Sequence, residues 1–202
     1  MTTDTRRKWR FGGFRTNFFP RDFATTPPPV SGQFHWRRAL LDQLDPRPQE
    51  TICDVGCGSG RLAVLVKSAS PFASVYGFDP DAHALNRAEQ RARRVSAMVH
   101  FTHATLDDVG AKLAQLRPSK IVSTFVLHHI PQNRRLELMT SLYEGLRSAG
   151  SLHLVEYAGR DGSRRSLGVM ALAEAARFSF VRETCATETL LGRISIYKAI
   201  KS

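Results

Sequence analysis

The stretch Thr51–Gly60, with the sequence TICDVGCGSG, constrains the fold more than any other part of this 202-residue chain. Apolar residues such as Ile52 and Val55 predict a short β-strand over residues 51–55. Glycines at positions 56, 58 and 60 then predict a sharp turn that a ligand can approach without meeting a Cβ atom. The apolar pattern after residue 60 predicts a helix whose first N–H groups face this turn. A strand, a glycine-rich turn and a helix in this order are typical of a site for a nucleoside-like or anionic ligand.

The spacing of the glycines distinguishes this turn from the dinucleotide motif G-x-G-x-x-G, because Arg61 occupies the position of that motif's third glycine. An acidic residue, Asp54, stands just before the glycines. Farther along, the segment SVYGFDPD predicts a second strand over residues 75–78 that ends in Asp79. A carboxylate at the tip of such a strand can accept hydrogen bonds from both hydroxyls of a ribose.

The pattern D-x-G-x-G-x-G, combined with an aspartate at the end of the second strand, resembles the class I S-adenosylmethionine-dependent methyltransferases. The resemblance implies an α/β fold with a doubly wound, Rossmann-like seven-stranded sheet that ends in a C-terminal antiparallel β-hairpin. It implies S-adenosylmethionine as the cofactor, with the ribose on Asp79 and the methionine end along residues 54–60. The implied cofactor-binding residues are Asp54, Gly56, Cys57, Gly58, Ser59, Gly60, Asp79, Pro80, Ala104, Thr105, Leu106, Thr124 and Phe125.

The rest of the chain fits this alternation of strands and helices. Further strands are predicted over 97–103, 120–127 and 151–156, and helices over 33–44, 82–94, 106–116, 132–147 and 164–177. The run KIVSTFVL at 120–127 is apolar almost throughout, as expected of a central parallel strand that is covered on both faces. Two strand-like runs at the end, 178–185 and 193–200, have no helix between them and predict the terminal hairpin.

A second segment that carries the resemblance is 123–159. Its sequence VLHHIP, followed by a helix and the turn LRSAG, is similar to small-molecule methyltransferases of the ubiquinone and menaquinone biosynthesis type. The resemblance covers residues 33–202, which we expect to form the methyltransferase domain, and leaves residues 1–32 as an N-terminal extension. One departure concerns the base: the family usually has an acidic residue where this chain has Thr105, so Asp107 or a backbone carbonyl would recognise the adenine.

Candidate catalytic residues follow the predicted strands at the end where doubly wound folds bind their ligands. They are His128 and His129 after the fourth strand, and Glu156 and Tyr157 after the fifth. Such a group is needed as a base only when the nucleophile carries a proton that must leave. The alternative is structural: one histidine caps or packs against the next helix, and Glu156 pairs with an arginine.

Charge and cysteine content bear on partners and location. The net charge is +11, and residues 1–38 hold eight basic against two acidic residues together with several aromatic rings. The N-terminal extension within it, residues 1–32, is interpreted as a lid over the acceptor pocket, with an RNA-binding arm or a solvated tail as alternatives. The three cysteines have no metal-ligand spacing, which predicts free thiols, no bound metal and a reducing, cytoplasmic location. The chain has no apolar run of about 18 residues, so no membrane span is expected. No secretory signal is expected either.

These patterns predict methyl transfer from S-adenosylmethionine to an oxygen, nitrogen or carbon atom of a small-molecule acceptor. An RNA methyltransferase that uses the basic N-terminal arm is one alternative. A non-catalytic protein that binds S-adenosylmethionine is the other. The sequence does not define the acceptor or the oligomeric state.

Overall fold

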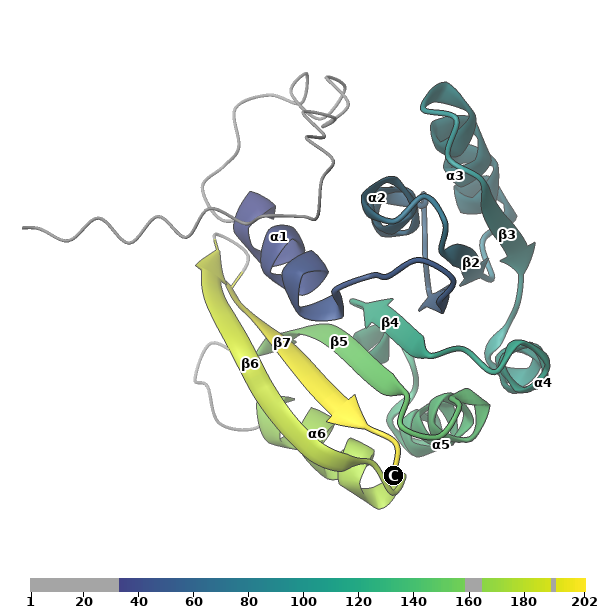
Figure 1. The fold of residues 1–202 in the computed structure, drawn as a ribbon. Coiled ribbons are helices and arrows are strands. Elements are labelled where there is room, and N and C mark those ends of the chain that lie inside the picture. The colour runs from purple at the N-terminus through teal and green to yellow at the C-terminus, as the bar shows by residue number, and fades with distance from the viewer. Residues whose placement is uncertain (1–32, 159–164, 190–191) are drawn as a thin grey trace, which may run out of the picture.

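A seven-stranded sheet runs through the protein between two layers of helices in the computed structural model, which describes residues 33–158, 165–189 and 192–202 (Figure 1). The strands are β1 (Thr51–Val55), β2 (Ser74–Asp79), β3 (Val99–His103), β4 (Lys120–Thr124), β5 (Ser151–Ala158), β6 (Ser179–Thr189) and β7 (Gly192–Ile200). Their order in the sheet is β3-β2-β1-β4-β5-β7-β6. The first five strands are parallel, whereas β7 runs antiparallel to both β5 and β6.

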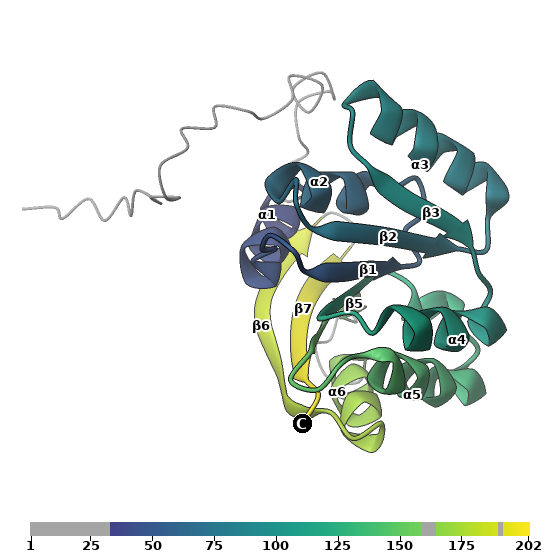
Figure 2. The same ribbon diagram turned by 45° about the vertical axis from the view of Figure 1, so that its right-hand side comes forward.

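Helices of the described residues cover both faces of the sheet (Figure 2). One layer contains α1 (Gln33–Leu44), α2 (Arg61–Ala69) and α3 (Ala82–Arg94), and the other contains α4 (Leu106–Leu116), α5 (Arg135–Gly145) and α6 (Arg165–Ala175). Side chains of alternate strand residues point to opposite faces of the sheet and belong to two separate apolar cores. Ile52 and Val122 pack toward α1 and α2, whereas their neighbours Cys53 and Ile121 pack toward α4 and α5. This two-sided burial explains why the central strands read as continuous apolar runs.

The predicted α/β fold with a terminal hairpin is confirmed, since β7 inserts between β5 and β6. The predicted strand over 120–127 is wrong at its end. It stops at Thr124, because Phe125 has a φ of 59°, in the left-handed region, and residues Leu127–His129 form a 3₁₀ turn. The helix predicted from residue 132 likewise begins with a 3₁₀ turn, Gln132–Arg134, and α5 starts at Arg135.

Two further predictions concern the N-terminal extension and membrane-spanning helices. The N-terminal extension 1–32, interpreted as a lid, lies outside the described residues. Among the described residues, no helix is both long and apolar enough to cross a membrane.

A partly buried polar network joins α1 to the sheet. The Gln43 side-chain amide donates to His153 Nδ1 at 2.9 Å, and His153 Nε2 lies 2.9 Å from Ser151 Oγ. Thr184 on β6 donates in turn to the Gln43 carbonyl oxygen. Burial, together with the positive charges of Lys198 and Lys120, lowers the pKa of His153 to about 3. The imidazole is therefore neutral and links α1 to β5 through its hydrogen bonds.

We expect the replacement His153→Leu to change how stability depends on pH. Folded His153 protonates only near pH 3, whereas in the unfolded chain it protonates near pH 6.5. The wild type should therefore lose about 1.4 kcal/mol of unfolding free energy per pH unit as the pH falls through this window. The variant is less stable at pH 7 and should lack this slope, so the two curves converge on acidification. Urea unfolding between pH 7 and 4 measures this, with the exposed-site variant His83→Gln as the control; parallel curves would contradict the assignment.

Candidate cofactor and acceptor site

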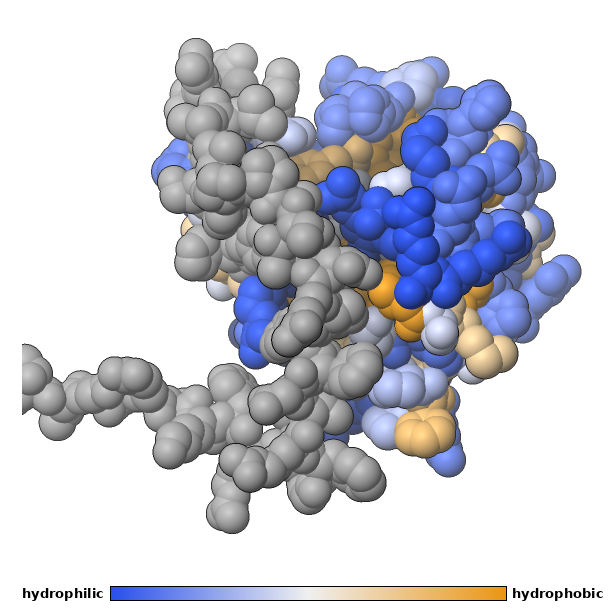
Figure 3. Space-filling view, turned by 90° about the horizontal axis from the view of Figure 1, so that it is seen from above, coloured by the Kyte–Doolittle hydropathy of each residue, from blue (hydrophilic) through white to orange (hydrophobic). Residues whose placement is uncertain are grey.

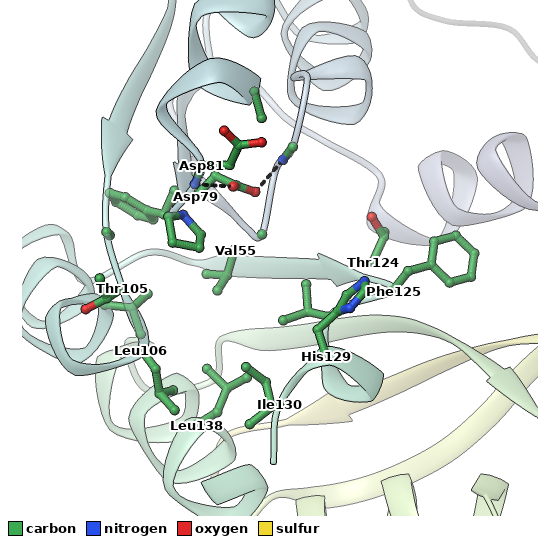
Figure 4. Close-up of a pocket in the computed structure, with 18 of the residues that line it drawn as sticks. Val55, Asp79, Asp81, Thr105, Leu106, Thr124, Phe125, His129, Ile130 and Leu138 are labelled. Atoms are coloured by element: carbon green, nitrogen blue, oxygen red, sulfur yellow. Dashed lines mark hydrogen bonds between the residues drawn. The ribbon is translucent and has the colours of Figure 1, made fainter.

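A cleft of about 530 Å³ opens at the carboxyl ends of β1, β2 and β4 (Figure 4). This is where doubly wound folds bind ligands, because the strand order reverses between β1 and β4. The lining residues are Val55, Gly56, Gly58, Ser59, Phe78, Asp79, Pro80, Asp81, Ala84, Arg87, Ala104, Thr105, Leu106, Val109, Thr124, Phe125, Val126, His129, Ile130 and Leu138.

The end of β2 holds the glycine loop, residues 56–60, in place. The Phe78 carbonyl accepts hydrogen bonds from the backbone N–H groups of Gly56 and Cys57, at 2.8 and 3.0 Å. The Asp79 carboxylate accepts from Gly58 N–H at 2.7 Å and from Asp81 N–H at 2.9 Å, one bond to each oxygen (Figure 4). Each carboxylate oxygen keeps further acceptor capacity for a ligand hydroxyl. The loop is therefore shaped by the protein itself.

The three glycines of the loop have different surroundings. A Cβ at Gly58 would have no atom within 4 Å, so this position faces open space in the cleft. A Cβ at Gly56 would lie 2.2 Å from Val126 Cγ2, and one at Gly60 would lie 2.7 Å from Ala88 Cβ. Gly56 and Gly60 are therefore required by close packing, whereas Gly58 leaves room for a ligand.

Asp54 is buried behind the loop and does not line the cleft. Neither of its carboxylate oxygens has a partner with hydrogen-bond geometry. Burial and the nearby charge of Asp79 raise the pKa of Asp54 to about 7, and the Ala63 amide in the first turn of α2 only partly opposes this shift. Such a group favours a cationic neighbour.

These features fit a nucleoside cofactor that also carries a charged amino-acid end. The cleft has the size of ordinary small-molecule sites. A fixed carboxylate at Asp79 faces it, open space adjoins Gly58, and a buried carboxylate without a hydrogen-bond partner lies behind the loop. The geometry therefore accommodates S-adenosylmethionine.

The base end of the cleft is bounded by Ala104, Thr105 and Leu106. Thr105 and Asp108 form a capping box at the start of α4, so their side chains are occupied with each other. Asp107, suggested above as a reader of the base, does not line the cleft and pairs with Arg134 instead. Backbone groups at the start of α4 are therefore the remaining candidates for recognising the adenine base.

The predicted catalytic residues gather at the opposite end. His128 Nδ1 lies 3.1 Å from Glu156 Oε2, and the Leu127 N–H donates to Glu156 Oε1 at 2.6 Å. The ring of His128 also contacts the rings of His129, at 4.0 Å between centroids, and Tyr157, at 5.7 Å. Of these four residues, His129 lines the cleft, and the other three stand beside it.

An aromatic row continues from these residues to α1. The Phe125 ring lies 4.7 Å from the ring of Tyr157 and 5.2 Å from that of Trp36, measured between centroids. Accordingly, the Phe125 side chain points away from the cavity while its backbone lines it (Figure 4).

Ten of the thirteen residues expected to bind the cofactor line the cleft, and Asp54, Cys57 and Gly60 do not. Cys57 is buried, and burial raises the pKa of its thiol, so it offers no reactive thiolate. Apolar residues such as Val126, Ile130 and Leu138 also line the cleft but were not predicted. Nothing in the sequence pattern identifies them, because their positions depend on the turn after β4. Asp81 could have been noticed as the residue that caps α3.

Comparisons with known proteins point in the same direction. A family model of a methyltransferase domain matches residues 52–150. An uncharacterized methyltransferase of Mycobacterium bovis is 35% identical over 106 residues, which cover 52% of this chain and 50% of that protein. A release factor glutamine methyltransferase of Moorella thermoacetica is 30% identical over 143 residues, which cover 66% of this chain and 49% of that protein. The chain thus spans about half the length of these curated relatives.

Solved structures share the fold. The magnesium protoporphyrin IX methyltransferase of Synechocystis PCC 6803, solved with bound S-adenosylmethionine, has a TM-score of 0.70 and 22% identity, with 90% of this chain and 89% of that chain covered. The [4+2]-cyclase SpnF has a TM-score of 0.67 and 14% identity, with 83% and 80% covered. At such identities the likeness establishes the fold alone. The domain match, the named relatives and this fold together confirm the predicted family, whose enzymes use S-adenosylmethionine: the chain belongs to the class I S-adenosylmethionine-dependent methyltransferases.

Proposed function

We propose that the protein transfers a methyl group from S-adenosylmethionine to an oxygen, nitrogen or carbon nucleophile of a small-molecule acceptor. One observation carries the proposal: the fixed carboxylate of Asp79 and the ring of His129 line the same cleft, and His128, Glu156 and Tyr157 stand beside it. The sulfonium supplies an electrophilic methyl group when the cofactor is bound, so the protein's task is to align the acceptor and exclude water.

The cofactor assignment follows the geometry of the loop. Asp79 would bind the ribose hydroxyls, residues 104–106 would hold the base, and residues 54–60 would hold the methionine end. The α-ammonium group of that end provides the positive charge that a buried Asp54 carboxylate favours.

His128 is the candidate proton acceptor. With Nδ1–H donating to the buried Glu156, the neutral imidazole keeps Nε2 as the atom that takes a proton from a hydroxyl or amine nucleophile. Glu156 would position the ring and stabilise the imidazolium, much as a third group orients the base in other enzymes. The structural alternative is that this pair only fastens the turn after β4 to β5, because Glu156 also accepts from Leu127 N–H.

A screen of acceptors tests the function directly. Purified protein, S-adenosylmethionine carrying a labelled methyl group and a metabolite extract would be incubated, and labelled products identified by mass spectrometry. Total RNA in a parallel reaction covers the alternative that the net charge of +11 suggests. Label in small molecules supports the proposal, and label in RNA alone would replace it with the alternative.

The replacement Gly58→Val should abolish binding of S-adenosylhomocysteine while the protein stays folded. The new side chain would enter the open space beside Gly58, whose φ of 52° also disfavours a β-branched residue. Calorimetric titration measures affinity, and circular dichroism checks the fold. Normal binding by the variant would show that the loop is only a structural turn.

The replacement Asp54→Asn should stabilise the ligand-free protein at pH 8. Because the folded pKa of Asp54 is raised to about 7, the wild type is destabilised progressively as the pH rises from about 4 to about 7. The neutral amide removes this cost, so the gain in melting temperature should be present at pH 8 and shrink at pH 5. Thermal melting at both values measures it, with the exposed Asp42→Asn as control; a loss of stability at pH 8 would contradict the assignment.

The variants His128→Asn and Glu156→Gln should separate the catalytic from the structural role of this pair. If His128 accepts the proton, methyl transfer falls at least about a hundredfold in His128→Asn, with cofactor affinity unchanged. Glu156→Gln should lower the rate of methyl transfer with the KM for S-adenosylmethionine unchanged, because the His128 ring loses the carboxylate that orients it. Unchanged methyl transfer in Glu156→Gln, with a lower melting temperature only, would leave the pair as a structural fastening.

A further inference from the structure

Phe125, the first residue after β4, has a backbone conformation that its own side chain disfavours. Its φ of 59° lies in the left-handed region, which bulky residues rarely adopt. A residue in such a conformation persists only where the surrounding structure holds it there, and residues of this kind gather at functional sites. The contacts that hold Phe125 in place are therefore of functional interest.

Contacts from β5 and from α1 hold Phe125. Its backbone N–H donates to the Val155 carbonyl at 2.8 Å, just past the end of β4. Its ring lies 4.7 Å from the ring of Tyr157 on β5 and meets the ring of Trp36 on α1 edge-on, at 5.2 Å and an interplanar angle of 88°. Such edge-to-face and offset arrangements are favourable for aromatic pairs. The ring of Phe125 is thus directed out of the cleft and toward α1 (Figure 4).

Trp36 meets Phe125 from a fixed position. Seen from the side of α2 and α3, hydrophilic side chains form much of the outer surface of this helix layer (Figure 3). Trp36 instead turns inward and is buried with Leu40 and Leu44, which follow it at helical spacing on the same face of α1. The hydrogen bond from Gln43 to His153 also ties α1 to β5. Core packing and this bond together fix where the Trp36 ring stands.

The turn after β4, residues 126–130, carries part of the acceptor end of the site. Within it, His128 lies 3.1 Å from Glu156, and His129 lines the cleft. A backbone hydrogen bond of 2.9 Å, donated by the His129 N–H to a carbonyl of the same turn, makes the turn compact. Because the turn is compact, the backbone direction at Phe125 decides where both histidines stand.

We propose that Trp36 is a positioning residue for methyl transfer. Its contact with the Phe125 ring keeps the Phe125 backbone in the left-handed conformation and so places residues 126–130 against the cleft. This inference rests on the proposed function and adds to it a residue of another element that does not itself line the cleft. A merely structural role would be filled by any large apolar side chain, whereas the positioning role needs an aromatic ring at residue 36.

Hydrogen exchange followed by mass spectrometry tests the positioning in the ligand-free protein. In Trp36→Leu, the hydrogen-bonded amides within residues 126–130 should exchange at least about tenfold faster, because the turn opens locally, while those of residues 56–60 change less than about twofold. Trp36→Phe keeps an aromatic ring and should restore most of the protection. The matched control Leu44→Ala removes buried apolar atoms from the same face of α1 and should not single out the turn.

Methyl transfer by the same variants tests the consequence for catalysis. With labelled S-adenosylmethionine and the metabolite extract as the source of acceptor, Trp36→Leu should lower the maximal rate at least about tenfold, with the KM for S-adenosylmethionine changed less than about twofold. Trp36→Phe should stay within about threefold of the wild type. Phe125→Leu should also be slow, and the double variant Trp36→Leu/Phe125→Leu no slower than the slower single variant, because both changes remove the same contact.

Several results would overturn the proposal. Unchanged exchange of residues 126–130 in Trp36→Leu, or an equal increase in Leu44→Ala, would make Trp36 an ordinary core residue. Rate losses that add in the double variant would show that Trp36 does not act through Phe125. If Trp36→Leu does not fold, Phe125→Leu carries the exchange test, and a turn that keeps its protection in that variant contradicts the proposal. If the wild type transfers no label to the extract, the proposed function fails instead, since the exchange comparison needs no ligand.

Discussion

The carboxyl end of β2 governs the shape of the whole site. Through the Phe78 carbonyl and the Asp79 carboxylate, it receives three backbone N–H groups of the glycine loop. Those bonds set where α2 begins and therefore where its first turn meets Asp54. They also fix one wall of the cleft, against which the turn after β4 packs through Val126. Fixed backbone donors and acceptors of this kind need no rearrangement when a ligand arrives.

The other half of the site depends on the terminal hairpin. Because β7 pairs antiparallel with β5, it covers the outer side of the strand that carries Glu156 and Tyr157. The hydrogen bond between Gln43 and His153 fixes α1 next to β5. In this position of α1, the ring of Trp36 contacts the ring of Phe125. The hairpin and α1 thus support the acceptor end, whereas β1 and β2 support the cofactor end.

The sequence was sufficient for features that depend on local pattern. The helices 82–94 and 106–116 were predicted with their observed bounds, because the local residue pattern defines them, and the glycine loop was placed by its motif. Features that depend on distant contacts were missed. Phe125 turns out of its strand although its neighbours are apolar, and Asp107 is taken up by Arg134 from another segment. The contact between His128 and Glu156 also requires β4 and β5 to be adjacent.

Asp79 illustrates how a residue can survive the loss of its function. Its carboxylate accepts from Gly58 N–H of the glycine loop with one oxygen and from Asp81 N–H with the other, so the local backbone depends on it whether or not a ribose is present. In a descendant that had stopped binding the cofactor, selection for folding alone would still retain this aspartate. Divergence in such a lineage would become visible at Gly58 before Gly56 or Gly60, because a side chain at Gly58 meets empty space and only its φ of 52° opposes the change.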